Sequence, residues 1–240
     1  MPDTTSKSAL DLYAKVEDLL GVKEAAPDLY RYYFDFLKTI DFDSLLDVGC
    51  GSGDFLLQIR EGFDPGRVTG IDLSPGMVEQ ARERGLDVRD VDLCMMDRSF
   101  GVVTAVFDML NYLNRRELGR FLRCVEERIV EGGTFLCDIN TLYGFEEIAV
   151  GSFIVDDDRR FLTIDSDFDE EMYESEFTLF EKEDELCFRK SKGIIRQYYH
   201  MVEEIDRLLP AMKLVQVKPV ALYGDEADKK FLAFQKITKS

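Results

Sequence analysis

The sequence predicts an α/β protein with a doubly wound, mostly parallel sheet, helices on both faces and an antiparallel β insert. Short apolar segments alternate with amphipathic helical segments up to about residue 150, which is typical of parallel crossover units. Residues 151–199 indicate hairpins, because runs rich in Phe, Ile, Thr and Tyr are separated by acidic turns. Helix and strand patterns return over 200–240.

We therefore expect four regions within the 240 residues, a length that fits one domain carrying an insert. N-terminal helices occupy 1–42, an α/β core 43–150, and the antiparallel insert 151–199. A C-terminal helix and strands over 200–240 complete the core sheet.

The first elements follow from local patterns. Amphipathic helices are predicted over 9–20 and 28–40, separated by Pro27, and a short strand, a glycine turn and a helix follow. A second strand over 68–73 leads into a helix with Ser74 as its N-cap and proline at the first helical position.

The later elements are predicted in the same way. A capping-box-like start from Asn114 to Glu117 begins a helix that Gly132-Gly133 should end, and Pro210 stops the last helix. The stretch 86–93 should hold the third strand together with an acidic residue. The remaining predicted strands are 100–106, 134–139, 153–155, 161–164, 172–180, 186–190, 194–199, 214–217 and 231–237, and the last helix is 201–209.

Composition excludes several classes of protein. The chain has 48 Asp and Glu against 30 Lys and Arg, a net charge of −18, which argues against a nucleic-acid binder because phosphates are bound by Lys and Arg. The 45% hydrophobic share is too high for a disordered acidic tail. No apolar run is long enough for a membrane helix and the first residues lack a signal pattern, so we expect a cytoplasmic protein that does not bind membranes.

Cysteine usage predicts neither a zinc site nor a disulfide framework. The five cysteines are scattered, never form a Cys-x-x-Cys pair, and are accompanied by a single histidine, His200. We expect buried free thiols at Cys50, Cys94, Cys124, Cys137 and Cys187.

The turn Asp47-Val48-Gly49-Cys50-Gly51-Ser52-Gly53 marks a ligand site. Glycines let a ligand approach the backbone, and the turn after the first strand is where doubly wound sheets bind ligands. Asp54 stands where a dinucleotide fingerprint needs glycine, and no Gly-Lys-Ser/Thr of a P-loop follows. Asp47 before the turn suits an ammonium group better than a pyrophosphate.

This turn resembles the first motif of the class I S-adenosylmethionine-dependent methyltransferases. Asp72 matches the family's second feature, an acidic residue that ends strand two. The resemblance covers about residues 40–142, with a looser match at Gln197-Tyr198-Tyr199. It implies a Rossmann-like seven-stranded sheet, S-adenosyl-L-methionine as cofactor and membership among the small-molecule N- and O-methyltransferases, including those acting on amino sugars.

The resemblance also implies a set of cofactor-binding residues. Asp72 would accept the ribose hydroxyls, and Leu73 and Met77 would line the adenine. Asp92 with Leu93, or alternatively Asp90, would lie toward the adenine amino group. The other positions are Asp47, Gly49, Cys50, Gly51, Gly53 and Phe107, whose backbone faces the methionyl part in one subgroup.

Methyl transfer from a sulfonium is an in-line displacement that needs alignment and exclusion of water, and it requires no metal. A general base can help but a neutral amine does not need one. His200, Asp108, Asn111 and Asp138 are the candidates, and the alternative for His200 is a surface or helix-capping position. Tyr13, Tyr30 and Tyr33 lie in helices that cover the cofactor in related enzymes, although core packing is the commoner role.

The insert is expected to form a lid over the acceptor. Residues 165–185 contain eleven carboxylates against Lys182, which either suits a cationic acceptor or forms a solvated strand face. The acceptor, its reacting atom (N, O or C) and the choice between monomer and homodimer stay open. A catalytically silent S-adenosylmethionine-binding sensor is the alternative function, and a nicotinamide oxidoreductase is a poorer third.

Overall fold

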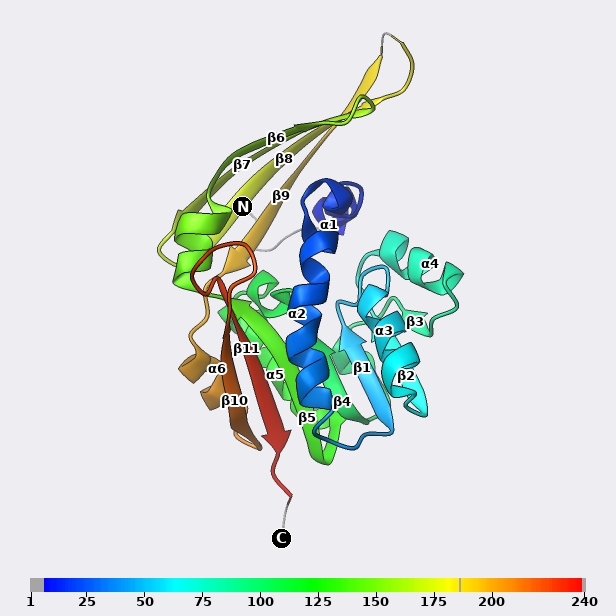
Figure 1. Cartoon of the computed structure of the whole chain (residues 1–240), viewed down its shortest axis with the longest axis vertical. Helices are drawn as coiled ribbons and strands as arrows, with labels where there is room; N and C mark the ends of the chain where they lie inside the picture. Colours follow the sequence, from blue (N-terminus) through cyan, green and yellow to red (C-terminus); the bar gives the residue numbers. More distant parts are fainter. Residues whose placement is uncertain (1–6, 186, 239–240) are drawn as a thin grey trace.

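The computed structural model describes residues 7–185 and 187–238. A seven-stranded sheet forms the body of the molecule, and a second sheet of four strands projects beyond it as a curved ribbon (Figure 1). The first residue of the predicted strand 186–190 lies outside the described residues. Residues 1–6 of the predicted N-terminal region also lie outside them.

The large sheet has the strand order β10-β11-β5-β4-β1-β2-β3. Its central strands pair in parallel, and β11 pairs antiparallel with both neighbours. The mostly parallel seven-stranded sheet is thus confirmed. The strands are β1 (Ser44–Val48), β2 (Arg67–Ile71), β3 (Val88–Arg89), β4 (Phe100–Ala105), β5 (Ile129–Asn140), β10 (Met212–Val220) and β11 (Lys229–Lys236).

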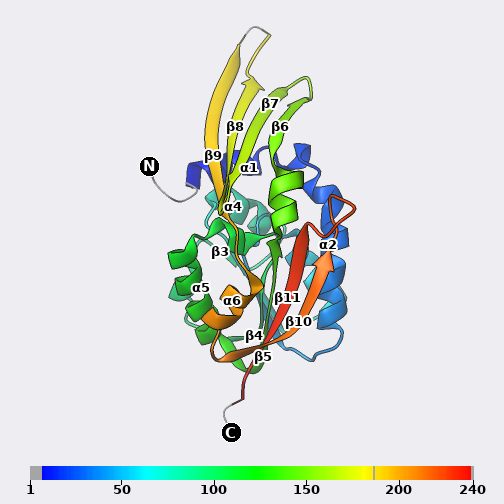
Figure 2. The same cartoon turned by 90° about the vertical axis from the view of Figure 1, so that its left-hand side faces the viewer.

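Helices cover both faces of this sheet because neighbouring strand residues point to opposite sides. Leu45 packs with α2 (Val22–Leu37), α3 (Asp54–Phe63) and α4 (Pro75–Glu83). Leu46 packs with α5 (Arg115–Arg128) and α6 (Val202–Leu208) on the other face. Figure 2 shows α5 and α6 on one side of the sheet and α2 on the other.

The projecting sheet is the predicted antiparallel insert. Its order is β6 (Gly151–Asp156), β7 (Arg160–Asp169), β8 (Met172–Lys182) and β9 (Phe188–Tyr198). The N-terminal helix α1 (Lys7–Ala14) and the short helix η1 (Glu17–Leu19) lie against its inner face, where Leu12 and Val16 pack with strand residues such as Leu162. This satellite core ties the beginning of the chain to the insert.

Local capping signals were read correctly. The Ser74 side chain accepts a hydrogen bond from the Met77 N–H at the start of α4, with proline at the first helical position. Asn114 and Glu117 form a complete capping box at the start of α5. Such signals need only a few neighbouring residues, which is why the sequence reveals them.

Two predictions about helix boundaries were wrong. Pro27 does not separate two helices but lies inside α2, whose N-cap is Gly21. Gly132 and Gly133 do not end α5, which stops at Arg128, but belong to β5. A Cβ at Gly133 would lie 2.7 Å from the Gly101 carbonyl oxygen, so close strand approach explains this glycine.

The predicted strands 186–190 and 194–199 form one strand, β9. Gly193 between them is not a break in the strand. A Cβ there would lie 3.1 to 3.3 Å from atoms of Leu12 and Ala9, so the glycine lets α1 approach the sheet.

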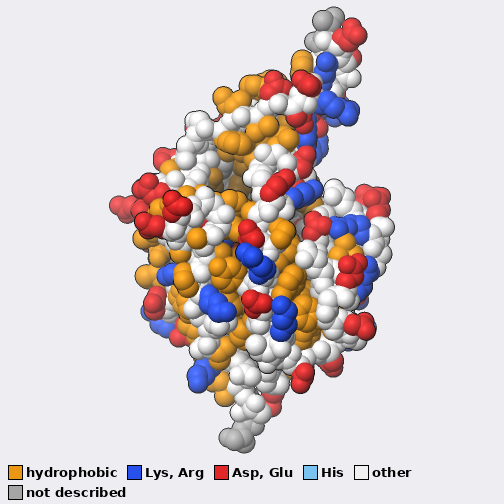
Figure 3. All heavy atoms as spheres, viewed as in Figure 1, with side chains coloured by type: hydrophobic (Ala, Val, Ile, Leu, Met, Phe, Trp, Pro, Cys, Tyr) orange, Lys and Arg blue, Asp and Glu red, His pale blue; other side chains and the backbone are white. Residues whose placement is uncertain are grey.

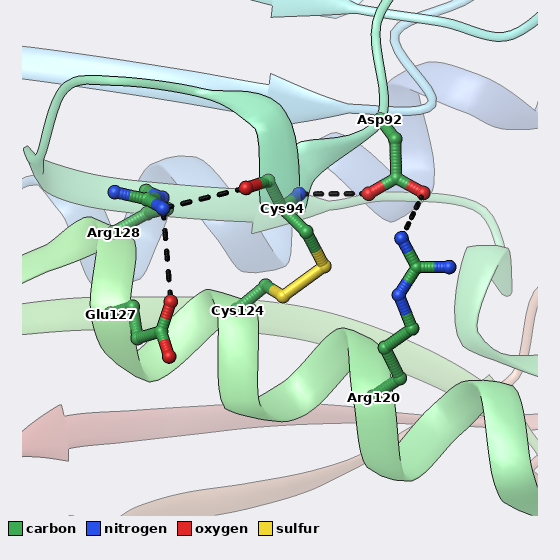
Figure 4. Close-up of a disulfide and its surroundings, with 6 residues drawn as sticks. All are labelled: Asp92, Cys94, Arg120, Cys124, Glu127 and Arg128. Carbon is green, nitrogen blue, oxygen red and sulfur yellow. Dashed lines mark hydrogen bonds and ion pairs between the residues drawn. A yellow bond between two sulfur atoms is a disulfide. The ribbon is translucent and has the colours of Figure 1, made fainter.

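The expectation of free thiols is wrong for two cysteines. Cys94 lies in the short helix η2 (Leu93–Met95), which packs against α5, and forms a disulfide with Cys124 of that helix (Figure 4). Their Cα atoms are 5.1 Å apart although 30 positions separate them in the sequence. Cys50 and Cys137 are buried free thiols as expected, whereas Cys187 is free and exposed.

Candidate functional site

The glycine turn joins β1 to α3 and adopts the left-handed backbone conformation at three positions. Gly49, Gly51 and Gly53 have φ values of 73°, 53° and 86°. A Cβ on Gly53 would lie 2.3 Å from a methyl carbon of Leu86, so this glycine is needed for packing. Nothing lies within 4 Å of a Cβ on Gly51, so the turn is open to a ligand there.

Asp72 lies directly beside this opening. One carboxylate oxygen accepts a hydrogen bond from the Gly51 N–H at 2.9 Å, and the other from the Ser74 N–H at 2.8 Å. Burial raises the pKa of Asp72, while these backbone hydrogen bonds act against the rise. The structure therefore joins the two motifs that the sequence predicted to act together.

Asp47 lies beneath the turn and is 2% exposed. Its carboxylate accepts a hydrogen bond from the Thr104 hydroxyl at 2.7 Å. Burial, with a smaller contribution from the Asp72 charge, raises the pKa of Asp47 to about 7 although the Thr104 hydrogen bond lowers it. Its ionisation therefore falls near neutral pH.

The neighbours of these carboxylates provide apolar surface. Leu73 is 45% exposed beside Asp72, whereas Met77 is buried in the first turn of α4. Cys50 is buried in the glycine turn, and burial raises the pKa of its thiol. A Cβ on Gly70 would lie 2.6 Å from the Cys50 sulfur, so this thiol fills space between the turn and β2.

The third predicted acidic position is directed elsewhere. Asp92 is the N-cap of η2, accepts a hydrogen bond from the Cys94 N–H at 2.8 Å, and pairs with Arg120 of α5 at 3.1 Å (Figure 4). Leu93 is 3% exposed within the core cluster that includes α5. The charge of Asp90, in contrast, contributes to the raised pKa of Asp72, which favours the alternative residue.

A second unusual turn follows β4. Phe107 and Asp108 have φ values of 57° and 47°, a conformation that is costly for non-glycine residues. The Asp138 carboxylate accepts the N–H of both residues at 2.8 Å, and the Tyr33 hydroxyl donates to it at 2.6 Å. Tyr33 is thus a buried helix residue that helps to fix this turn.

The sequence did not reveal Lys229 as part of the site. Its ammonium pairs with Asp108, donates to the Asn140 side-chain oxygen at 2.6 Å, and lies 3.8 Å from Asp138. Burial alone lowers the pKa of Lys229, but the two carboxylates outweigh it and the pKa is raised. The available signal was the pair Lys229-Lys230 directly before the apolar run of β11.

Asp108, Asn140 and Lys229 line a cavity of about 420 Å³ between the core and the insert. Hydrophobic side chains gather where the projecting sheet meets the body (Figure 3). A larger cavity of about 720 Å³ lies between the last turns of α2 and α3, remote from the strand ends that carry the motifs. We assign the acceptor side of the site to the smaller cavity, because Tyr13, Asp108 and Gln197 line it. The glycine turn and Asp72 are not part of this lining.

Two of the base candidates have other roles. His200 is 1% exposed and contacts the Leu113 carbonyl oxygen at 2.9 Å through Nε2, and burial lowers its pKa. It is therefore neither a surface residue nor the N-cap of α6, which is Met201. Asn111 bridges the core and insert by donating to the Tyr198 carbonyl at 2.7 Å. Neither lines the cavity, whereas Asp108 does.

Within the described residues, no group of three or more His, Cys, Asp or Glu side chains could hold a metal ion. Among the same residues, no helix is long and apolar enough to cross a membrane.

Comparison with known proteins gives the same assignment as the two motifs. Residues 45–133 match the methyltransferase domain family. This part of the chain is similar to a methyltransferase domain. The aklanonic acid methyltransferase DauC of Streptomyces sp. strain C5 is 35% identical over 115 residues, which are 42% of this chain and 51% of that protein. The chain therefore spans about half the length of this curated relative.

Solved structures resemble the whole fold of this chain. An S-adenosylmethionine-dependent methyltransferase from Clostridium acetobutylicum has a TM-score of 0.78 at 19% identity, covering 95% of this chain and 100% of that one. DesVI from Streptomyces venezuelae has a TM-score of 0.70 at 20% identity, covering 95% and 98%. The match of residues 45–133 confirms the predicted family resemblance. The solved structures confirm the predicted fold class, and at these identities they show the fold alone.

Proposed function

We propose that the protein transfers a methyl group from S-adenosyl-L-methionine to a small-molecule acceptor. The observation that carries the proposal is the opening at Gly51 beside Asp72. The same turn packs at Gly49 against Met109, the residue after Asp108, which lines the cavity. The bound cofactor would supply an activated methyl group on a sulfonium.

The cofactor site fits the residues that the resemblance implies. Asp72 would accept the ribose hydroxyls, because its oxygens can accept further hydrogen bonds besides those from Gly51 and Ser74. The exposed Leu73 and neighbouring Met77 would contact the adenine. We favour Asp90 over Asp92 for the adenine amino group. The fixed turn at Phe107 would face the methionyl part.

The acceptor would bind in the cavity between the core and the insert. The insert and α1 form one wall, and their satellite core holds this wall rigid. The Ser74 hydroxyl donates to Asp11 of α1 at 2.6 Å, so α1 also reaches the start of α4 beside Asp72. We therefore keep the proposed roles of the four regions, with α1 and the insert excluding water from the reaction.

The catalytically silent sensor is not favoured, since the relatives carry methyltransferase names. We further propose that the protein is cytoplasmic, acts without nucleic acid or membrane, and is a monomer or homodimer. The relatives' names include acids and an acyl-carrier-protein substrate, whereas structural neighbours include an amino pentose methyltransferase, so they do not agree on one acceptor.

Calorimetry with S-adenosylmethionine and its demethylated product tests the proposal. We expect the Asp72→Ala variant to bind the cofactor more weakly by about tenfold or more, since it loses hydrogen bonds to an ionised group. Asp35→Asn on the exposed surface of α2 is a matched control. Absence of binding by the unaltered protein, or unchanged affinity in the Asp72 variant, would contradict the proposal or the residue assignment respectively.

A further inference from the structure

The cavity has an aromatic wall made of tyrosines from different parts of the chain. Tyr13 comes from α1, Tyr112 from the short helix η3 (Met109–Tyr112), Tyr173 from β8, and Tyr223 from the loop between β10 and β11. Tyrosine rings present a face that attracts cations. Elements distant in sequence thus supply the same chemistry to one cavity.

The negative charge of Asp108 acts on three of these tyrosines, Tyr13, Tyr112 and Tyr223. The pKa of Tyr13 and of Tyr112 is raised by burial and, in addition, by the negative charge of Asp108. The pKa of Tyr223 is raised to about 12 by burial, with Lys229 lowering it and Asp108 raising it. Asp108 is therefore a negative charge that acts on three of the four tyrosines.

The cavity also carries an excess of negative charge. Asp108 and Asp228 line it and Asp138 lies beneath the Asp108 turn, against the single ammonium of Lys229. Lys229 is held by Asp108 and Asp138, so its charge is matched within the protein. The ion pairs of Lys229 are with Asp108 and Asp138, so its ammonium does not neutralise the carboxylate of Asp228.

Asp228 supplies an independent observation. It is 2% exposed, and its Oδ2 accepts hydrogen bonds from the backbone N–H groups of Leu222 and Tyr223. Its Oδ1 is buried and has no hydrogen-bond partner within the described part of the chain. A buried carboxylate oxygen without a partner is costly unless a donor reaches it. A ligand with N–H groups would satisfy this oxygen.

The acidic block of the insert is not the source of this charge. Its carboxylates do not line the cavity, and several pair with basic neighbours, as Glu174 does with Arg196 and Glu176 with Lys192. The interpretation as a solvated face is therefore correct for this block. The charge that faces the acceptor comes from the ends of core strands.

We propose that the cavity selects an acceptor that presents an amine, and that it disfavours acceptors methylated on a carboxylate. This inference rests on the proposed methyl transfer and names its acceptor class. Amines that gain positive charge are attracted by the tyrosine faces and by Asp108, whereas a carboxylate would meet like charges.

The reaction at an amine balances with the groups present. The neutral nitrogen gives its lone pair to the methyl carbon as the carbon–sulfur bond breaks, and that electron pair stays on sulfur. The nitrogen becomes a methylated ammonium and releases one proton. Two carboxylates line the cavity and can take up this proton. Both oxygens of Asp108 accept hydrogen bonds, from Lys229 and Gln197, whereas Asp228 Oδ1 has no partner within the described residues.

Binding of three matched probes tests the inference separately from catalysis. Cyclohexylamine, cyclohexanol and cyclohexanecarboxylate share one ring, and their affinities can be measured by NMR titration in the presence of the demethylated cofactor product. We expect the amine to bind more tightly than either analogue by about tenfold. Equal or tighter binding of the alcohol or carboxylate, or binding of none of the three, overturns the inference.

Variants identify the groups responsible. Asp108→Asn should reduce amine affinity by about tenfold and leave cyclohexanol affinity unchanged. Because this change leaves Lys229 short of a partner, a second pair of variants on the exposed loop is needed. Tyr223→Phe keeps the ring and should keep amine binding, whereas Tyr223→Leu should weaken it; equal effects of the two would refute the aromatic contribution.

Failure of this inference is distinguishable from failure of the proposed function. If calorimetry detects no cofactor binding, the methyltransferase proposal is wrong whatever the probes do. If the cofactor binds and the amine is not preferred, only the acceptor class is wrong. Asp35→Asn serves as the control for both measurements because Asp35 is an exposed residue of α2.

Discussion

The disulfide between Cys94 and Cys124 makes a measurable contribution to stability. Reduction removes a cross-link that joins positions 30 residues apart. In the chain-entropy treatment, a loop of that length restricts the unfolded chain by about 3.6 kcal/mol at 25 °C. For a chain of this size such a loss lowers Tm by about 7 to 14 °C.

Urea unfolding of the oxidised and reduced protein measures this contribution directly. The reduced protein should unfold at a lower urea midpoint, and the Cys94→Ala/Cys124→Ala variant should be insensitive to reductant. Cys187→Ser controls for the exposed thiol, because that variant keeps the disulfide and should lose as much stability on reduction as the unaltered protein. A loss below about 1 kcal/mol on reduction would refute the argument.

Three further variants test other parts of the site. Gly53→Ala should destabilise the protein by about 2 kcal/mol or more in thermal unfolding, since a Cβ there meets Leu86. Gly51→Ala should cost less stability, because a Cβ there meets nothing, and should mainly weaken cofactor binding in calorimetry. Asp138→Asn should cost about 1 to 3 kcal/mol in urea unfolding because one of the two backbone N–H groups it holds loses its acceptor; a neutral effect would contradict this role. The pKa of Asp47 is raised from 3.8 to about 7, so the stabilising protonated state is lost as pH rises through that window. The Asp47→Asn variant should therefore be more stable than the unaltered protein at pH 8 by at least about 1 kcal/mol in urea unfolding, and the difference should vanish near pH 4.

Local signals carried most of the fold prediction. The N-caps at Ser74 and Asn114, and the glycine turn after β1, each depend on residues within one turn of chain. Neighbouring positions such as Leu45 and Leu46 face opposite sides of the sheet, and buried parallel strands of this kind appear in the sequence as short apolar runs. Fold class follows from such patterns because they repeat along the chain.

Features that depend on contacts between distant residues were missed. Cys94 and Cys124 show no motif spacing, and only the packing of η2 against α5 brings them together. Lys229 meets Asp108 across 121 positions, because β11 is placed beside β5 in the finished sheet. Gly133 was read as a helix end because its actual neighbour, the Gly101 carbonyl, lies on another strand.

The net charge of −18 shows why composition alone does not define the acceptor. The acidic block of the insert lies on strands and turns whose charges are solvated or paired, as for Glu181 with Lys15 and Glu183 with Arg189. Exposed charges of this kind are screened by salt and act weakly over distance. Asp108 and Asp228 lie in the cavity instead, where less water screens them. Neutralising insert carboxylates such as Glu181 should therefore change solubility more than acceptor choice, whereas one change at Asp108 should alter the choice itself.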